Sequence, residues 1–190
     1  YYRCDVASAE DVALLFEKIK LRFTRLTGII HSAGVVRDGL LARKSWTDFY
    51  QVANSKLKGI VYLDQASAAM ALDFFVAFSS VSAVLGNQGQ TDYAFGNAYL
   101  DAFCRWRQLQ VQQGLRQGRS VSMNWPIWQQ GGMQIAPAVL AGLKQSIGMV
   151  PLATELGLQL FEQMMASDMA QLMPLYGVKT RLDRLVQQRN

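Results

Sequence analysis

The sequence predicts an α/β fold in which helices cover both faces of a doubly wound parallel sheet. Short apolar runs alternate along the chain with segments of helical periodicity, a pattern typical of strands joined by crossover helices. The run from Asp73 to Phe78 is continuously hydrophobic, as expected for a strand buried on both faces. Small and polar residues follow several of these runs, and such sheets bind ligands at the carboxyl ends of their strands.

The composition indicates a folded, cytoplasmic protein. Hydrophobic residues make up 51% of the 190 residues and charged residues 17%, which suffices for a buried core. Cys4 and Cys104 lie far apart in the chain, as expected of two reduced thiols in the cytosol. His31 is the single histidine, which excludes a multi-histidine metal site, and we expect no metal.

Charge and hydropathy exclude two further classes of function. The net charge of +5 comes from 19 basic and 14 acidic residues. The basic residues are scattered rather than gathered in a run, which argues against binding to nucleic acid. No uninterrupted apolar stretch reaches membrane-spanning length, so we expect no membrane association.

The first expected elements are the end of a strand at Tyr1–Cys4 and a helix opened by Ser8. Asp11 follows Ser8 by three residues, which resembles a capping box. The apolar positions of this helix share one face; they are Val12, Leu15, Phe16, Ile19 and Phe23. Later elements are expected as strands at 26–31, 73–78, 119–124 and 171–176, and as helices at 46–70, 93–113 and 152–165.

Two further segments have no regular pattern. Residues 79–92 are rich in Gly, Ser, Gln and Asn and are expected to form a loop. Residues 130–150 contain Gly131, Gly132, Pro137 and Gly148 and are expected to form a lid with a short helix. The chain begins in the middle of a strand pattern, so we interpret residues 1–190 as a single partial domain.

The segment from Phe78 to Asn97 carries the strongest chemical signal. Ser80 stands at a strand end, and Tyr93 follows a glycine-bearing loop in the first turn of a helix. Two hydroxyl groups in this arrangement can converge on one substrate oxygen. The segment resembles the short-chain dehydrogenase/reductase superfamily, in which a serine and a tyrosine flank the carbonyl that is reduced.

One departure from that superfamily narrows the resemblance. Most members carry a lysine four residues after the tyrosine, where this chain has Asn97, and here Lys56 lies upstream. This exchange resembles the ketoreductase domains of modular polyketide synthases, particularly those served by a separate acyltransferase. Three further segments agree with that family; they are 31–35, 93–102 and 124–133. The resemblance implies a Rossmann-like fold that lacks its first two strands here, from about the third strand onward.

The resemblance also implies a catalytic set made of Lys56, Ser80, Tyr93 and Asn97. Tyr93 would protonate the carbonyl oxygen and Ser80 would hydrogen-bond it. A phenol has a pKa of about 10, so a nearby cation must make Tyr93 a better acid. Lys56 would supply that cation, held with an ordered water by Asn97, although Lys58 competes for the role.

The implied cofactor is NADPH. By resemblance, Asp5 and Val6 would contact the adenine, and Pro126 the carboxamide of the nicotinamide. Ser32, Ala33 and Gly34 would let the backbone approach the cofactor sugar. An aspartate at a strand end also caps turns, which is the plain alternative for Asp5. No glycine-rich phosphate turn precedes Asp5, so we expect this segment alone to bind the cofactor weakly or not at all.

Stereocontrol is expected from three positions. Asp38 falls where members that form the D-configured β-hydroxyl end a Leu-Asp-Asp motif, although the first two positions of that motif are Val36 and Arg37 here. A plain turn before Gly39 is the alternative for Asp38. Leu85 stands where members of the opposite, A-type class carry a tryptophan. Met133 belongs to the expected lid. We assign five apolar residues to this lid; they are Met133, Ile135, Val139, Leu140 and Leu143. The alternative is that these residues form the ordinary core of a helix.

The implied substrate is a β-ketoacyl chain on the phosphopantetheine arm of an acyl carrier protein. The upstream part of the same ketoreductase and other synthase domains would be further partners. Carrier proteins are commonly acidic, so Arg37, Lys44 or Arg105 could lie at a docking surface. Three alternatives stay open: a freestanding reductase, against which Asn97 counts, a silent structural domain, and an epimerase.

Overall fold

The computed structural model describes residues 1–132 and 135–188. The chain divides into two compact units. One comprises Tyr1–Asn124 and Met169–Leu172, and the other Trp125–Asp168 and Met173–Asn190. Whether the chain is one partial domain of a larger protein therefore stays a prediction.

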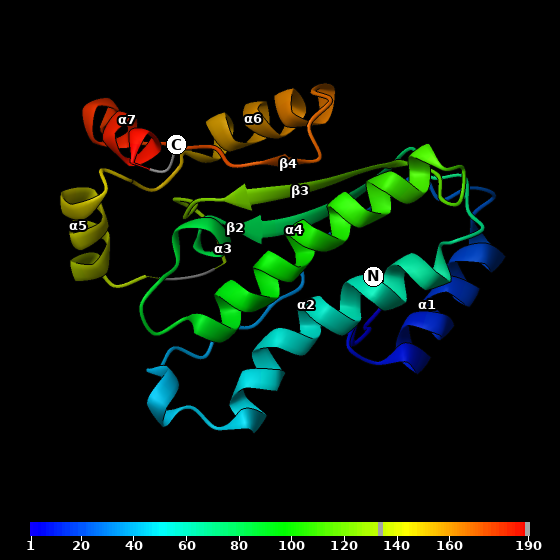
Figure 1. Ribbon diagram of the computed structural model, residues 1–190. Coiled ribbons are helices and arrows are strands. Elements are labelled where there is room, and N and C mark those ends of the chain that lie inside the picture. Colours follow the sequence, from blue (N-terminus) through cyan, green and yellow to red (C-terminus); the bar gives the residue numbers. More distant parts are fainter. Residues whose placement is uncertain (133–134, 189–190) are drawn as a thin grey trace. The chain divides into compact units, whose positions relative to one another are not determined.

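The first unit is built on a four-stranded sheet in the order β1-β2-β3-β4. The strands are β1 (Gly28–His31), β2 (Phe74–Ser80), β3 (Arg119–Trp125) and β4 (Gln171–Leu172). β1 pairs with β2 in parallel, and β3 pairs with β4 in parallel. The arrows of β2 and β3 point the same way in Figure 1. The expected α/β fold with a parallel sheet is confirmed.

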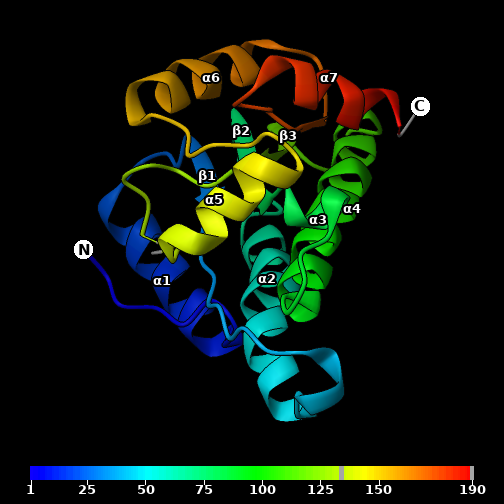
Figure 2. The ribbon, with the colours of Figure 1, turned by 90° about the vertical axis from the view of Figure 1, so that its left-hand side faces the viewer.

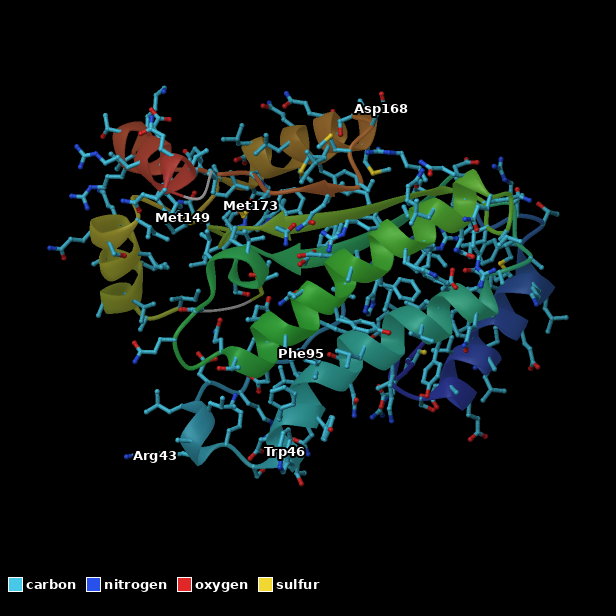
Figure 3. The ribbon with its side chains drawn as sticks, viewed as in Figure 1. Arg43, Trp46, Phe95, Met149, Asp168 and Met173 are labelled. Carbon is cyan, nitrogen blue, oxygen red and sulfur yellow. The ribbon has the colours of Figure 1, made fainter. Side chains whose placement is uncertain are left out.

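Helices α2 (Trp46–Ala66) and α4 (Thr91–Gln112) lie side by side, as the views in Figures 1 and 2 agree. α1 (Ala9–Arg22) packs against α2. As expected, Ser8 caps α1, because its hydroxyl accepts the backbone N–H of Asp11 at 3.2 Å. Near the beginnings of α2 and α4, the rings of Phe49 and Phe95 lie 5.6 Å apart, and Figure 3 labels Trp46 and Phe95 in this region.

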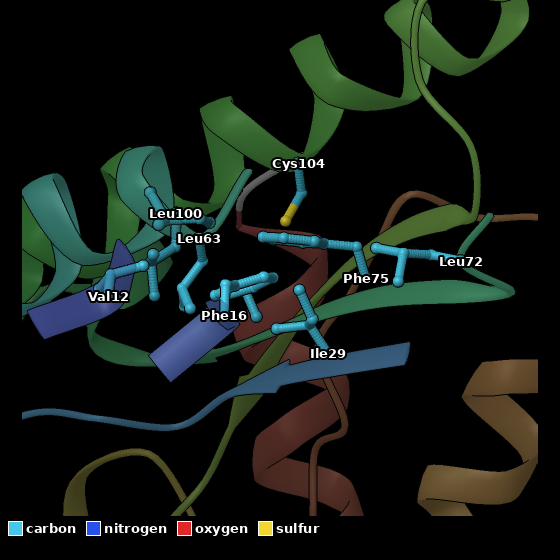
Figure 4. Packing of buried hydrophobic residues seen from close by; sticks show 10 residues of the cluster. Val12, Phe16, Ile29, Leu63, Leu72, Phe75, Leu100 and Cys104 are labelled. Carbon is cyan, nitrogen blue, oxygen red and sulfur yellow. The ribbon is translucent and has the colours of Figure 1, made fainter. Parts of the chain in front are cut away.

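The hydrophobic core lies between the sheet and these three helices, as Figure 4 shows. Its buried members come from α1, α2, α4, the strands and the turn before β2; they are Val12, Phe16, Ile29, Ile60, Leu63, Leu72, Phe75, Ala77, Leu100 and Cys104. Burial raises the pKa of the Cys104 thiol to about 12, so this cysteine is an inert core residue.

Gly96 determines how closely α2 and α4 approach. A Cβ at this position would lie 3.3 Å from Lys56 Cδ and 3.6 Å from Ala53 Cα. A larger side chain would therefore push α4 away from α2 beside Lys56. The close crossing brings the beginning of α4 next to the middle of α2.

The second unit contains α5 (Pro137–Ser146), α6 (Thr154–Ala166) and α7 (Lys179–Gln187). The Trp128 ring packs directly on Gly157 of α6, where a Cβ would lie only 2.5 Å from ring atom Cη2. The rings of Trp125 and Trp128 meet edge to face at 4.9 Å. α5 has no fully buried residue: Val139 is exposed, and Leu140 and Leu143 are half-buried. Whether these apolar residues form a lid or helix core stays a prediction.

Several expected elements differ from the structure. Tyr1–Cys4 is not a strand, because within the described residues no strand pairs with it. β4 ends at Leu172 rather than at residue 176, and Pro174 just beyond it has no N–H for the ladder. Phe23 follows α1 as its exposed C-cap instead of joining the buried face.

Three short elements were not expected from the sequence. The segment expected as a loop contains α3 (Ser82–Leu85), and residues Leu41–Arg43 form the 3₁₀ helix η1. α7 also went unpredicted, since its sequence is strongly charged and Leu182 is its one buried residue. Short or highly polar helices give too few apolar positions for periodicity to reveal them.

Candidate active site

The four side chains predicted to be catalytic meet in the first unit. Ser80 ends β2, Tyr93 and Asn97 lie in the first turns of α4, and Lys56 lies in the middle of α2. Lys56 Nζ is 5.6 Å from the centre of the Tyr93 ring. The side chains of Asn97 and Ser80 lie close enough to the Tyr93 phenol to lower its pKa against the rise caused by burial. Their convergence is the arrangement that reduction of a carbonyl needs, and their catalytic roles stay predictions.

Lys56 is a buried cation with few partners. It is 3% exposed, and its Nζ donates to the Phe78 carbonyl at 3.3 Å. Among the described residues, no carboxylate forms an ion pair with it. Burial lowers the pKa of Lys56 to about 8, while the negative charge of Asp101 acts in the opposite direction. The group is therefore mainly an ammonium at pH 7, with its charge beside the Tyr93 ring.

Tyr93 keeps its proton at neutral pH. Burial raises the pKa of its phenol, and the hydrogen bonds from Asn97 and Ser80 offset part of this rise. A protonated phenol can act as an acid toward a substrate oxygen. Its conjugate phenolate would form next to the Lys56 ammonium, which stabilises negative charge.

Ser80 and Asn97 are oriented by the backbone. The Ser80 hydroxyl accepts the N–H of Ser82 at 3.2 Å, and its own O–H can still donate, either to the Tyr93 oxygen or to a substrate oxygen. Asn97 is fully buried, and its Nδ2 donates to the Tyr93 carbonyl at 2.8 Å. Asn97 Oδ1 has no hydrogen-bond partner within the described part of the chain.

A buried polar network supports this site from behind. Ser79 Oγ donates to the Asn97 carbonyl at 3.1 Å. The amide nitrogen of Asn124 lies 3.0 Å from the Ser79 hydroxyl, 3.1 Å from the Ser80 carbonyl and 2.8 Å from the Asp101 carboxylate. Asp101 also accepts from Gln171 at 3.1 Å. One amide thus connects the chain segments that carry Ser80 and Asn97.

Most of this network was missed in the sequence, although a signal was present. Ser120, Ser122 and Asn124 alternate along β3, and all three are fully buried. Polar residues at alternate positions of an apolar strand lie on one face and require partners when buried. The partner Asp101 comes from α4, 21 residues before Ser122, and the pattern alone does not identify it.

The loop after β1 lies beside Lys56. A Cβ at Gly34 would be 3.4 Å from both Cε and Nζ of Lys56. Ser32 and Gly34 are exposed and Ala33 is half-buried. Lys58 is exposed on α2, so the buried Lys56 rather than Lys58 is the lysine that the structure brings to Tyr93.

His31 ends β1 with a buried imidazole that the sequence analysis did not assign. It is 2% exposed, and its Nε2 has no partner among the residues that the structure describes. Burial and, less strongly, the charge of Lys56 lower the pKa of His31 to about 4, and a hydrogen bond to the Ser55 backbone acts against both. The imidazole is neutral at pH 7.

The two residues predicted to contact the adenine, Asp5 and Val6, have different surroundings in the structure. Asp5 Oδ1 accepts the N–H of Ala7 at 2.9 Å, so this carboxylate closes the turn that leads into α1. Val6 lies against α2, with its Cγ2 3.1 Å from the position of a Cβ on Gly59. Pro126 belongs to the second unit. Met133 lies outside the described residues.

The predicted stereocontrol residues lie close to the loop before Tyr93. Asp38 Oδ1 accepts from Gln90 Nε2 at 2.9 Å, and half-buried Leu85 is the last residue of α3. The expectation for Lys44 is wrong. Its side chain is only 4% exposed and pairs with Asp92 at 2.6 Å, so it is not available to a docking partner.

Two kinds of site find no support in the described residues. No group of three or more histidine, cysteine or acidic side chains is placed to hold a metal ion there. In the same ranges, no helix combines the length and apolar character needed to cross a membrane.

Residues 1–130 match the family model described as "KR domain". The chain belongs to the KR domain family. Polyketide synthase PksN of Bacillus subtilis (strain 168) is 40% identical over 177 residues, covering 93% of this chain and 3% of that synthase. Polyketide synthase ThaG of Burkholderia thailandensis is 36% identical over 182 residues, covering 96% of this chain and 3% of that protein. The predicted membership among polyketide synthase ketoreductase domains is confirmed.

Solved ketoreductase structures share the fold of this KR domain. A ketoreductase domain from the bacillaene assembly line superposes with a TM-score of 0.95 at 38% identity, covering 97% of this chain and 44% of that one. An N-terminal ketoreductase from the macrolactin assembly line gives a TM-score of 0.85 at 36% identity, covering 97% and 35%. The present chain therefore spans less than half the length of these solved structures.

Proposed function

We propose that this chain forms the catalytic part of a ketoreductase that reduces a β-ketoacyl group on an acyl carrier protein to a β-hydroxyacyl group, with NADPH as reductant. The supporting observation is the convergence of Tyr93, Ser80, Asn97 and Lys56 at the carboxyl end of β2. A carbonyl oxygen held between the two hydroxyl groups would receive a hydrogen bond from each of them.

We propose that NADPH binds along the loop after β1. Ser32, Ala33 and Gly34 would hold its sugar, with the Lys56 ammonium beside Gly34. Val6, packed on α2 at Gly59, would contact the adenine. When bound, the cofactor supplies the hydride that reduces the ketone carbon.

The side chains then manage the oxygen and its proton. The Ser80 hydroxyl, which already accepts from Ser82, donates to the substrate oxygen and so polarises the carbonyl. Tyr93 transfers its phenolic proton to the same oxygen as negative charge develops there. The Lys56 ammonium stabilises the resulting phenolate, and Asn97 Oδ1 would orient the group that returns the proton.

The stereochemical part of the proposal rests on Asp38. Asp38 hydrogen-bonds with Gln90, which lies three residues before Tyr93. This contact fixes the loop of residues 37–44 to the segment before Tyr93. With Leu85 in place of an A-type tryptophan, we propose that the product carries the D-configured β-hydroxyl. Chiral chromatography of the alcohol formed from a β-ketoacyl thioester measures this directly, and an L-configured product would contradict it.

The reaction is tested on the complete protein that carries this chain. NADPH oxidation is followed with a β-ketoacyl pantetheine thioester and with the same chain on an acyl carrier protein. Tyr93→Phe should lower the rate by about 10²- to 10⁴-fold, since it removes the proton donor. Tyr99→Phe is the matched control, because it makes the same change on α4 outside the site and should leave the rate nearly unchanged.

Other outcomes would identify other functions. Exchange of deuterium at the substrate α-carbon without NADPH consumption would indicate an epimerase. A folded protein with neither activity would indicate a silent structural domain. Rapid reduction of small ketones with no preference for the carrier-bound chain would indicate a freestanding reductase.

A further inference from the structure

A buried ion pair lies directly beside the catalytic tyrosine. Lys44 Nζ and Asp92 Oδ2 are 2.6 Å apart, and the two side chains are 4% and 1% exposed. Removing two charges from water is unfavourable, and well-packed apolar residues at such positions are often equally or more stabilising. The pair is therefore better explained by the geometry that it holds than by stability alone.

On one side, the pair is fixed to the first turn of α4. Asp92 immediately precedes Tyr93, and its Oδ1 accepts the Tyr93 backbone N–H at 2.9 Å. An acidic side chain in the first helical turn also interacts favourably with the helix dipole. With Oδ1 on Tyr93 and Oδ2 on Lys44, both carboxylate oxygens take part, so a shift of Lys44 is transmitted to the Tyr93 backbone.

On the other side, the pair is fixed to the loop of residues 37–44. Lys44 Nζ donates to the Arg37 carbonyl at 2.6 Å. Two further hydrogen bonds run in parallel between this loop and the segment before Tyr93. Gln90 donates to Asp38 at 2.9 Å, and the Gly39 N–H donates to the Gly89 carbonyl at 2.9 Å.

Of the contacts between the loop of residues 37–44 and the segment before Tyr93, the one made by Lys44 involves a buried charged side chain. The Asp38–Gln90 hydrogen bond is exposed to solvent, so water competes with it. The Lys44 side chain, by contrast, is only 4% exposed, and its ammonium joins the Arg37 carbonyl at the solvent-exposed side to the buried Asp92 carboxylate. Charge-assisted hydrogen bonds in a buried setting are short and strongly directional, which suits them to hold two segments in register.

We propose that Lys44 is a positioning residue, which through Asp92 holds the loop of residues 37–44 against the beginning of α4 and so orients Tyr93 relative to the substrate face selected by that loop. The inference rests on the proposed reduction. According to this inference, the ion pair affects both the rate of the reduction and the stereochemical purity of its product. Neither Lys44 nor Asp92 needs to touch the substrate for this role.

The test compares variants of the complete protein in the reduction of a β-ketoacyl thioester. Lys44→Met removes the cation. The double variant Lys44→Met/Asp92→Leu removes both charges and leaves no unpaired buried charge, although the Tyr93 N–H loses its acceptor. Each should lower kcat by about 10- to 100-fold with a smaller change in KM, because the reacting groups are misplaced. Each should also raise the proportion of the minor stereoisomer by about tenfold.

Control variants separate positioning from loss of the fold. Lys179→Met removes the lysine of an exposed ion pair with Asp183 and should change neither kcat nor the product ratio. Circular dichroism and thermal unfolding show which variants are folded. If Lys44→Met does not fold, the double variant and the isosteric Asp92→Asn, which keeps an acceptor for the Tyr93 N–H, provide the same measurements.

The outcomes distinguish this inference from the proposed function. An unmodified protein that does not reduce the thioester contradicts the proposed function itself. An active unmodified protein, with folded variants that keep its kcat and its product ratio, overturns the role of Lys44. Lower kcat with an unchanged product ratio would also contradict the inference, since the loop would then not be coupled to the choice of face.

Discussion

Two buried cations on neighbouring helices have different surroundings. Lys56 of α2 lies beside Tyr93 and Asn97 near the beginning of α4, whereas Arg107 lies near the end of α4 against Asp64 of α2. Arg107 is fully buried, and its Nε donates to Asp64 at 2.7 Å. Its remaining donors reach Gly118, Ser120 and Gln117, and Arg116 adds a second cation to Asp64.

The difference shows how pairing separates a structural charge from a reactive one. Burial lowers the pKa of both cations, but at Arg107 the hydrogen bond and the charge of Asp64 oppose this directly. A guanidinium with every branch bonded stays charged and immobile. Within residues 1–132 and 135–188, Lys56 has one weak backbone hydrogen bond and no carboxylate in ion-pair contact, so its charge stays available to a phenolate.

The largest effect on stability is expected at Arg107, the fully paired cation. Arg107→Met leaves Asp64 buried with only Arg116, which should lower the free energy of unfolding by about 3–5 kcal/mol. The kcat of the folded protein should not change. Urea unfolding followed by circular dichroism measures the first quantity. Arg116→Met, which removes the partly exposed partner of Asp64, should lower the free energy of unfolding less than Arg107→Met does. A larger loss of stability in Arg116→Met would contradict the view that Arg107 is the structural charge.

The largest effect on activity is expected at Lys56. Lys56→Met should lower kcat by about 10²- to 10⁴-fold, because the phenolate of Tyr93 loses its counter-charge. The free energy of unfolding should not fall, since the substitution removes an incompletely paired buried charge. Lys58→Met changes an exposed lysine on the same helix and should keep the rate. A stable, active Lys56→Met protein would show that the two cations do not differ in function.

His31, a third buried basic side chain and one without a carboxylate partner in the described residues, should make stability depend on pH. Its pKa is about 4 in the folded protein, against a reference value of 6.5. Between these values the unfolded chain binds a proton that the folded protein does not, so acidification favours unfolding. This contribution should lower stability by about 3 kcal/mol as the pH falls from 6.5 to 4.

The measurement compares the unmodified protein with His31→Gln, which has no group titrating in this range at that position. Urea unfolding at pH 7, 5.5 and 4 gives the free energies. The difference between the two proteins should grow in favour of His31→Gln as the pH falls. A constant difference would mean that the imidazole is protonated in both states or in neither.

The smallest expected effect is the response of the reaction rate to alkaline pH. The pKa of Lys56 is about 8, so the ammonium is lost above this pH. The kcat for reduction should be nearly level below pH 8 and should fall by about tenfold per pH unit above it. Stopped-flow measurement of NADPH oxidation between pH 6.5 and 9.5 gives this profile. An unchanged rate at pH 9.5 would remove the Lys56 charge from the mechanism.

Much of this molecule followed from the sequence because the signals are local. The Ser8 cap, the apolar face of α1 and the buried run in β2 depend on residues a few positions apart. The order of Lys56, Ser80, Tyr93 and Asn97 likewise carried the family resemblance without any coordinates. The bounds of β4 and the absence of a strand at Tyr1–Cys4 did not follow, because a strand exists only with its partner.

By itself, the sequence determined the alternation of strands and helices and the chemical types present around the expected site. Only the tertiary structure decided which polar groups meet. Lys44 pairs with Asp92 across 48 positions, and Asn124 reaches Ser79 across 45. Such contacts depend on how closely α2, α4 and the sheet pack, as at Gly96. Periodicity along one segment carries no information about that distance, because it is set by the side chains of several segments together.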